Sequence, residues 1–429
     1  MEERKVTYKD ILSNPEYRKL IFSSVIDRFG DSVDAIAFTW IVYKITGSAA
    51  WSAIVFGLNM LPNVLVQPFA GAIVERMNKK LVIIVTHLMR AAVIIVFALM
   101  YRFGTVNAYV LVAITLLITT IESFNLPANS AFIAKTISKE DMTSGISLNT
   151  MLTGAAALAG TGLGGVIIAA WGVIPAMFVD VLTFAIAASL IASMRSESKS
   201  DSESKQPETA VRKEETFFSL FKDGIRYVIN TPVVRNFCLL CVALNFMLVP
   251  INALQAPIAS EIFKSGAELL SFAGAMSSIG GILGSAVLPA VSRKFSPLKI
   301  TCMGIVALGL GILGISFGGI FAGNRLATYL SAGFCLFIMM MAASLIGGVL
   351  GIQFKKSVDG EYMARASAVF GATSTAAMPI GSFMVSVLLT VIPTSRILLF
   401  GAVFAGIILL ATGLLKPSLE KKEDLYETA

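Results

Sequence analysis

Three aspartates near the start of the chain could bind protons. Asp27, Asp31 and Asp34 are spaced i, i+4 and i+7, which places all three on one face of an α-helix. Three ionised carboxylates on one face would repel each other, so at least one is expected to take up a proton near neutral pH. The alternative is that Asp27 only pairs with a cation such as Arg28 or Arg90, and that Asp34 lies in water at the membrane surface.

Other ionisable and amide side chains also fall within apolar stretches. Arg90 and Glu122 are such residues, and because charge is costly inside a bilayer each is a candidate for function. His87 is the only histidine and could titrate at physiological pH, although an ordinary histidine near the membrane surface is the simpler interpretation. Its presence three residues before Arg90 leaves the nearby aspartates or Glu122 as counter-ions for the arginine. The candidate amides for a polar cavity are Asn59, Asn63, Asn245, Asn252 and Gln255.

Residues for other kinds of chemistry are scarce. No Gly-Lys-Ser/Thr phosphate-binding signature occurs, which argues against ATP hydrolysis by this chain. A membrane enzyme would need a clustered nucleophile or metal triad. The four cysteines, Cys238, Cys241, Cys302 and Cys335, lie in apolar segments without a histidine nearby, as buried packing cysteines do. We therefore expect no enzymatic activity, metal or cofactor.

The elements that carry these residues must lie in a membrane. Of 429 residues, 56% are hydrophobic and 14% are charged, whereas soluble chains average about 25% charged residues. The mean hydropathy is +0.79. A spanning helix needs about 20 mostly apolar residues. Twelve such stretches occur, near 20–43, 50–73, 81–101, 107–133, 146–170, 174–194, 234–260, 269–291, 298–321, 327–353, 366–391 and 396–415.

Basic residues predict how these spans are oriented. Lysine and arginine collect in short cytoplasmic loops, and 27 of the 34 fall on one side of the twelve-span arrangement. The other side carries Lys44, Arg102, Lys264, Arg325 and Arg396. Both termini are therefore expected in the cytoplasm, in a plasma membrane, and no cleavable signal peptide precedes the first span. The net charge of +7 then reflects orientation toward anionic lipid more than nucleic-acid binding.

The chain divides at one polar segment. Residues 195–215 are low in complexity and rich in charge, so they cannot bury a core and are expected to form a linker. The following residues to 230 place their apolar side chains on one helical face, which predicts a short helix on the cytoplasmic membrane surface. The predicted units are a six-helix bundle (1–194), a linker with this surface helix (195–231) and a second six-helix bundle with a tail (232–429).

The two predicted bundles also resemble each other. Arg76 after span 2 matches Arg293 after span 8 at an offset of 217, and Gly160 matches Gly381 at an offset of 221. Matches at equivalent places predict a duplicated six-span unit, with its copies related by an axis along the membrane normal.

The turn between spans 2 and 3, GAIVERMNKK at 71–80, is a candidate for conformational gating. Gly71 would let helices approach, Asn78 tolerates the left-handed conformation of a tight turn, and Glu75 can pair with a basic residue or a helix N-terminus of the other half. Such a contact would hold one conformation of a two-state protein. The alternative is a basic loop that only follows the topology rule.

This turn resembles the loop signature of the major facilitator superfamily, Gly-x-x-x-Asp-Arg-x-Gly-Arg-Lys/Arg. The chain keeps Gly71, Arg76 and Lys80, and has Glu75, Asn78 and Lys79 at the other three positions.

Span 5 is similar to the antiporter motif Gly-x-x-x-Gly-Pro-x-x-Gly-Gly. It keeps Gly160, Gly164 and Gly165, but Ala156 and Thr161 replace the first glycine and the proline. The segments GDSVDAIAFTWIVYKITGSA, LPNVLVQPFAG and FNLPANSAFI resemble the branch with the macrolide efflux pumps and the enterobactin exporter.

The resemblance implies an all-α integral membrane protein with twelve transmembrane helices in two pseudo-symmetric six-helix bundles. It implies alternating access around a cavity lined by spans 1, 4, 7 and 10, and proton-coupled efflux of an amphipathic drug-like or siderophore-like molecule by a bacterial monomer. A lipid or lysolipid flippase of the same fold and a non-transporting sensor remain alternatives. Since the second half has almost no charge at membrane depth, its cavity wall is expected to be mainly apolar and amide.

Overall fold

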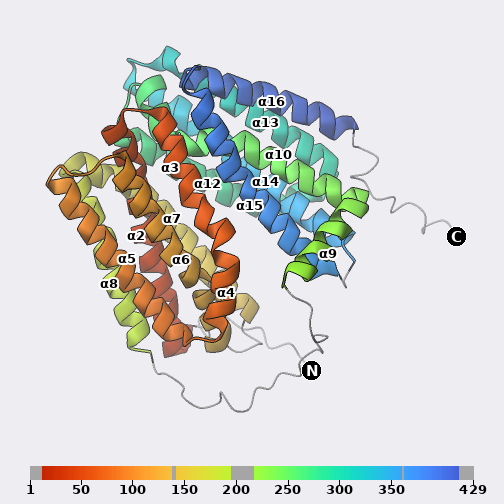
Figure 1. Ribbon diagram of the computed structural model, residues 1–429. Coiled ribbons are helices and arrows are strands. Elements are labelled where there is room, and N and C mark those ends of the chain that lie inside the picture. Colours follow the sequence, from red (N-terminus) through yellow and green to blue (C-terminus); the bar gives the residue numbers. More distant parts are fainter. Residues whose placement is uncertain (1–11, 138–141, 195–216, 360–361, 415–429) are drawn as a thin grey trace.

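The computed structural model describes residues 12–137, 142–194, 217–359 and 362–414, and these residues form helices with no strand among them. The first half lies on one side of the molecule and the second half on the other (Figure 1). The first half contains α2 (Pro15–Thr46), α3 (Ala49–Leu65), α4 (Gln67–Glu75), α5 (Lys79–Arg102), α6 (Ala108–Thr136), α7 (Met142–Trp171) and α8 (Val173–Ala192).

The second half follows the same order with more breaks. The predicted linker, 195–215, lies outside the described residues, and a helix, α9 (Phe217–Asn230), follows it. The remaining elements are α10 (Pro232–Ala253), α11 (Gln255–Pro257), the π-helical turn η1 (Ile258–Ile262), α12 (Ala267–Ser292), α13 (Pro297–Ser316), the short helix η2 (Gly318–Phe321), α14 (Arg325–Ser357), α15 (Met363–Leu388) and α16 (Thr394–Leu414).

Eleven of the twelve predicted spans are confirmed among the described helices. Ten described helices are long and apolar enough to cross a membrane, and the pair α3 and α4, bent by 41°, makes one more. The twelfth is α2, whose 32 residues are long enough to cross but carry too much charge to be recognised by hydropathy. Span 7 is broken, because α10 ends at Ala253 and the backbone continues through α11 and η1.

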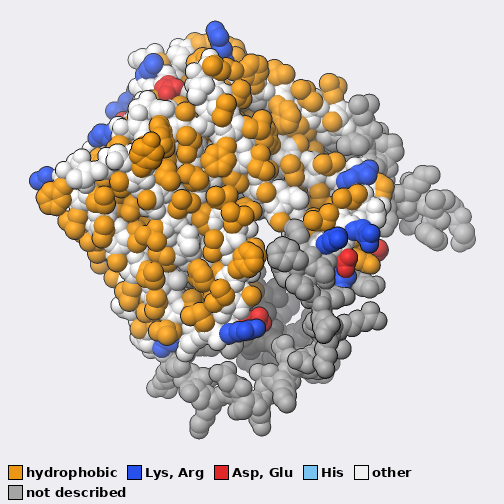
Figure 2. Space-filling model, in the orientation of Figure 1, with side chains coloured by type: hydrophobic (Ala, Val, Ile, Leu, Met, Phe, Trp, Pro, Cys, Tyr) orange, Lys and Arg blue, Asp and Glu red, His pale blue; other side chains and the backbone are white. Residues whose placement is uncertain are grey.

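The surface agrees with a membrane location. On the face in Figure 2, hydrophobic side chains cover the middle and Lys and Arg side chains lie at the margins. Phe400, Val403, Ile407 and Leu410 on α16 are each more than half exposed. A broad exposed apolar band of this kind is expected where a protein contacts lipid.

Equivalent contacts show that the two halves are copies. In the first half, Gly160 of α7 packs against Phe29 of α2, and in the second half Gly381 of α15 packs against Phe246 of α10. Phe29 and Phe246 are 217 residues apart, and Gly160 and Gly381 are 221 residues apart. The matching loop residues show the same two offsets. The predicted pseudo-symmetry therefore extends to packing.

The halves meet at one end of the bundle. We call the end with the start of α2, the α4–α5 turn and the end of α8 the linker end. Contacts between the halves lie toward the opposite end, where the Ser382 hydroxyl donates to the Ala53 carbonyl at 2.5 Å and the Gly165 N–H donates to the Ser271 hydroxyl. Toward the linker end, a buried apolar cluster that includes Tyr17 draws all its residues from the first half.

Candidate functional site: a cavity between the halves

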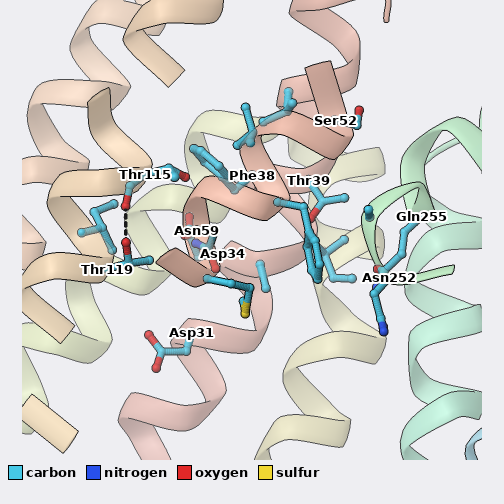
Figure 3. A pocket seen from close by; sticks show the side chains of 18 of the residues that line it. Asp31, Asp34, Phe38, Thr39, Ser52, Asn59, Thr115, Thr119, Asn252 and Gln255 are labelled. Carbon is cyan, nitrogen blue, oxygen red and sulfur yellow. Dashed lines mark hydrogen bonds between the residues drawn. The ribbon is translucent and has the colours of Figure 1, made fainter. Parts of the chain in front are cut away.

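Two adjoining hollows lie between the halves. The first has a volume of about 410 Å³ and the second about 310 Å³. Because they share part of their lining, they form one continuous cavity. Figure 3 shows side chains that line the first hollow. The shared lining residues are Arg28, Asp31, Ala35, Ile36, Asn252 and Gln255.

Charged side chains line the first hollow. Asp31 and Asp34 come from α2, Arg90 from α5 and Glu122 from α6. In Figure 3 the α2 aspartates lie between Thr119 of α6 and the amides of the second half. Four of the five ionisable candidates therefore line one cavity. The fifth, Asp27, does not line it.

Arg90 is the centre of the buried charges. Its Nη2 donates to Asp31 Oδ1 at 2.6 Å, and its Nη1 lies 4.0 Å from Asp27 Oδ1. The guanidinium carbon also lies 4.3 Å from the centroid of the Phe184 ring, a cation–π contact. Arg90 therefore contacts two aspartates of span 1 and is the side chain that neutralises Asp31.

His87 belongs to this cluster, and its interpretation as an ordinary surface histidine is wrong. The residue is 3% exposed. Its Nδ1 lies 2.7 Å from the Ile83 carbonyl and its Nε2 lies 3.1 Å from Asp27 Oδ1. Because a carbonyl only accepts, Nδ1 must carry a proton. The contact from Nε2 to a carboxylate oxygen then requires a second proton, so His87 and Asp27 together hold one proton between them.

Asp34 and Glu122 differ from the other acids of the cavity. Neither makes an ion pair or side-chain hydrogen bond with a described residue. A carboxylate that leaves water without a partner is strongly disfavoured. Both carboxyl groups face the cavity and can accept hydrogen bonds from the cationic group of a ligand.

The second-half wall is apolar with a few amides and hydroxyls. Asn252 and Gln255 flank the break in span 7 and project toward the cavity (Figure 3). Pro250 precedes this break, and irregular backbone at membrane depth occurs where it lines a cavity. The second hollow adds Ser277 and Ser278 and the apolar residues Ile258, Phe263, Leu269, Leu270, Leu336 and Met340.

Of the other predicted amides, only Asn59 lines the cavity. Asn245 donates to the Cys241 carbonyl one turn earlier on its own helix at 3.0 Å. Asn63 lines neither hollow. Spacing along a helix could not separate these residues, because rotation about the helix axis decides which of them faces the other half.

The glycines of span 5 serve two different contacts. Gly160 and Gly164 pack against α2, where a Cβ at Gly164 would lie 3.3 Å from the Ile36 Cβ. Gly165 instead packs against Ala267 and Ser271 of α12 in the other half. The motif therefore lets one helix approach both its own bundle and the opposite one.

The candidate gating turn differs from its predicted geometry. Among the described residues, no heavy atom lies within 4 Å of the position of a Cβ at Gly71, so no described helix approaches there. Asn78 has φ −71° and ψ 107°, which is extended, and its side chain accepts from the Leu81 N–H as the N-cap of α5. Glu75 and Arg76 are exposed at the linker end.

Lys79 and Lys80 of this turn are held within the first half. Lys79 Nζ donates to the Glu75 carbonyl at 2.5 Å. Lys80 Nζ donates to the Ala192 and Met194 carbonyls at 2.9 and 2.7 Å, so it caps the end of α8, where a cation is favoured.

Two charged residues of the spans were not among the site residues predicted from the sequence, and only the first of them lines the cavity. Arg28 lines both hollows, and its i, i+3 and i+7 relation to Asp31 and Ala35 could have placed it on the cavity face. Asp180 on α8 is buried, with the Thr183 hydroxyl 3.3 Å from its Oδ1. No sequence signal separates that aspartate from an ordinary polar residue of a span.

Comparisons with known proteins agree with this architecture. The chain is 24% identical over 303 residues to the "Multidrug efflux pump Tap" of Mycolicibacterium fortuitum, covering 70% of this chain and 72% of the relative. It is 22% identical over 304 residues to the "Staphyloferrin A transporter" of Staphylococcus aureus, covering 70% of this chain and 74% of the relative.

Solved structures share the fold. The crystal structure of nucleoside transporter NupG matches with a TM-score of 0.74 at 12% identity, covering 94% of this chain and 99% of that chain. A bacterial homologue of the iron transporter ferroportin in an inward-facing state matches with a TM-score of 0.70 at 13% identity, covering 94% and 99%. The family model described as "Major Facilitator Superfamily" matches residues 20–382, and the chain therefore belongs to this superfamily of transporters.

Proposed function

We propose that this protein is a proton-coupled exporter of amphipathic drug-like or siderophore-like molecules that works by alternating access as a monomer in a bacterial plasma membrane. The observation that carries the proposal is the cavity between the halves, where Asp34 and Glu122 lack partners among the described residues. The relatives named as a multidrug efflux pump and a siderophore transporter support the cargo class.

The orientation follows from the basic loops. Their excess at the linker end assigns that end to the cytoplasm. The described contacts between the halves lie at the opposite end, which supports the proposal of an inward-facing state. A substrate from the cytoplasm or the inner leaflet would then enter at the linker end.

The coupling step is a competition for the same carboxyl groups. When Asp34 or Glu122 is protonated, the cavity loses a negative charge and holds a cationic ligand less tightly. When the ligand is bound, the proton is excluded. A ligand can shift the equilibrium between two conformations only by the difference between its binding free energies for them. Arg90 with Asp31 and His87 with Asp27 provide a neutralised framework around this site.

Uptake into proteoliposomes tests the proposal. With an acidic lumen, the wild type should accumulate ethidium in exchange for protons, and nigericin should abolish the accumulation. The double variant with Asp34→Asn and Glu122→Gln should fall to the level of protein-free liposomes.

The control is Asp223→Asn, because this residue of α9 lies outside the spans and its variant should transport normally. Uptake that ignores the pH gradient would contradict proton coupling. Gradient-driven uptake that survives in the double variant would contradict the role of the two carboxyls.

A further inference from the structure

Arg28 is a charged side chain that the coupling step does not use. It lies 13 residues after the start of α2, about 20 Å along the helix, and therefore near the middle of a bilayer. Its side chain is exposed and lines both hollows. A charge at this depth is costly, so its place in the cavity needs a physical reason.

The neighbouring acids do not neutralise Arg28. Asp27 contacts His87 at 3.1 Å and Asp31 contacts Arg90 at 2.6 Å. Arg28 makes no ion pair or side-chain hydrogen bond with a described residue. Its guanidinium therefore offers a complete set of donors to the cavity, and a planar guanidinium suits a carboxylate, which it can bind through two hydrogen bonds.

Groups of opposite charge are also separated within the cavity. Asp34 and Glu122 line the first hollow only, whereas Arg28 lies where the two hollows join. Arg28 and Asp34 are six residues apart on α2, which is about 9 Å along the helix axis. The two carboxyls can hold the cationic group of a ligand, and a molecule that also carries a carboxylate matches Arg28 as well.

We infer that the substrate class is a zwitterionic amphiphile whose carboxylate binds Arg28. Its amine lies near Asp34 and Glu122, and its apolar body fills the second hollow beside residues such as Phe263 and Met340. This inference rests on the proposed function and assigns separate roles to the amine and the carboxylate of the ligand. The amine competes with the proton, while the carboxylate gives affinity and selectivity without taking part in the competition.

Binding to a matched pair of ligands tests this inference. The probes are a fluoroquinolone with a free carboxyl group and a piperazine amine, and its methyl ester, which keeps the amine and the apolar body but lacks the carboxylate. Calorimetry on the purified chain in nanodiscs, at one fixed pH near 7, measures both dissociation constants. The wild type should bind the acid at least about 10-fold more tightly than the ester, as expected for a charge-assisted hydrogen-bond pair.

Three variants separate recognition from folding. Arg28→Gln should bind acid and ester equally and retain the ester affinity of the wild type, and Arg28→Lys should keep part of the preference. Arg102→Gln, at the exposed end of α5, should behave as the wild type. Unaltered ester binding serves as the internal check that the Arg28 variants are folded.

Several outcomes would overturn the inference. These are a wild type that binds the two ligands equally, prefers the ester or binds neither, and an Arg28→Gln variant that keeps the preference for the acid. No pH gradient is present in this measurement. A chain that distinguishes acid from ester but transports independently of pH would therefore keep this inference and lose the proposed function.

Discussion

At the residue scale, the first half concentrates its charge around Arg90. This residue binds Asp31 at 2.6 Å, lies 4.0 Å from Asp27 and stacks on Phe184. Removing one member of a buried ion pair leaves the other charge uncompensated, which costs about 3–5 kcal/mol. The network is therefore a structural unit as well as a part of the cavity.

Arg90→Gln should lower the free energy of unfolding by about 3 kcal/mol, because Asp31 keeps its charge without a cation. Thermal unfolding in detergent should show this as a lower transition temperature. Adding Asp31→Asn to that variant should restore part of the loss. A double variant that is less stable than Arg90→Gln alone would show that the pair is not the source of the stability.

The contact between His87 and Asp27 should make stability depend on pH. The contact exists only while one proton lies between the two groups, so its contribution is present at low pH and is lost as the pH rises and the proton leaves. Wild-type thermal stability should therefore decline as the pH rises above about 6.5, the ordinary pKa of histidine.

His87→Gln replaces the shared proton with an amide N–H that does not titrate. This variant should show a flatter dependence of the unfolding temperature on pH over the same range. If its profile parallels that of the wild type, another group carries the pH dependence.

At the scale of elements, apolar length predicts the spans well, whereas helix breaks and rotations are harder to predict. The sequence indicated twelve spans, including α2, although the charged residues of α2 make it less apolar than the others. The break at Leu254 and the bend at Val66 depend on prolines and neighbouring helices acting together, so composition does not locate them. Which of Asn59 and Asn63 faces the cavity also depends on the rotation of α3.

Pseudo-symmetric glycines form the closed contact between the halves. A Cβ at Gly57 would lie 3.1 Å from the Ser382 Cβ, and a Cβ at Gly274 would lie 2.5 Å from the Thr161 Cγ2. The glycines match at an offset of 217 and the hydroxyl residues at 221. A side chain at Gly274 would force Thr161 to move, and one at Gly57 would press on Ser382, so both positions should influence how firmly this end closes.

Gly274→Leu should shift the population from the inward-facing toward the outward-facing state, since the new side chain cannot fit against Thr161. Spin labels at exposed Met77 and Phe295, in a chain without its native cysteines, report the width of the linker end by electron paramagnetic resonance. The variant should show more of the shorter distance.

Gly281→Leu on the same helix is the matched control, because no heavy atom lies within 4 Å of a Cβ at that position. It should leave the distance distribution unchanged. An equal shift in both variants would show that the effect comes from the helix and not from the contact.

At the scale of the whole molecule, the two halves differ in the side chains that they contribute to the cavity. They share packing contacts at matching positions, yet the carboxyls and arginines of the cavity come from the first half and the second half contributes amides, hydroxyls and apolar surface. The duplicated fold provides two bodies that can rock about the cavity. The unequal chemistry places carboxyl groups on one wall and mainly apolar surface on the other.

A hydrogen-bond network joins the halves at the closed end. The Tyr43 hydroxyl of α2 donates to Glu261 Oε1 at 3.0 Å, and the Thr394 hydroxyl donates to Glu261 Oε2 at 2.5 Å. Tyr43 must separate from Glu261 whenever this end opens. The network therefore opposes opening of this end.

The central claim, that protons and substrate compete for one cavity, is tested most directly by proton release on ligand binding. Ethidium is suitable because its charge is permanent. Added to purified protein in weakly buffered detergent with a pH-sensitive dye, it should release protons from the wild type and none from the double variant with Asp34→Asn and Glu122→Gln. Ethidium binding without proton release, or with proton uptake, would contradict the account.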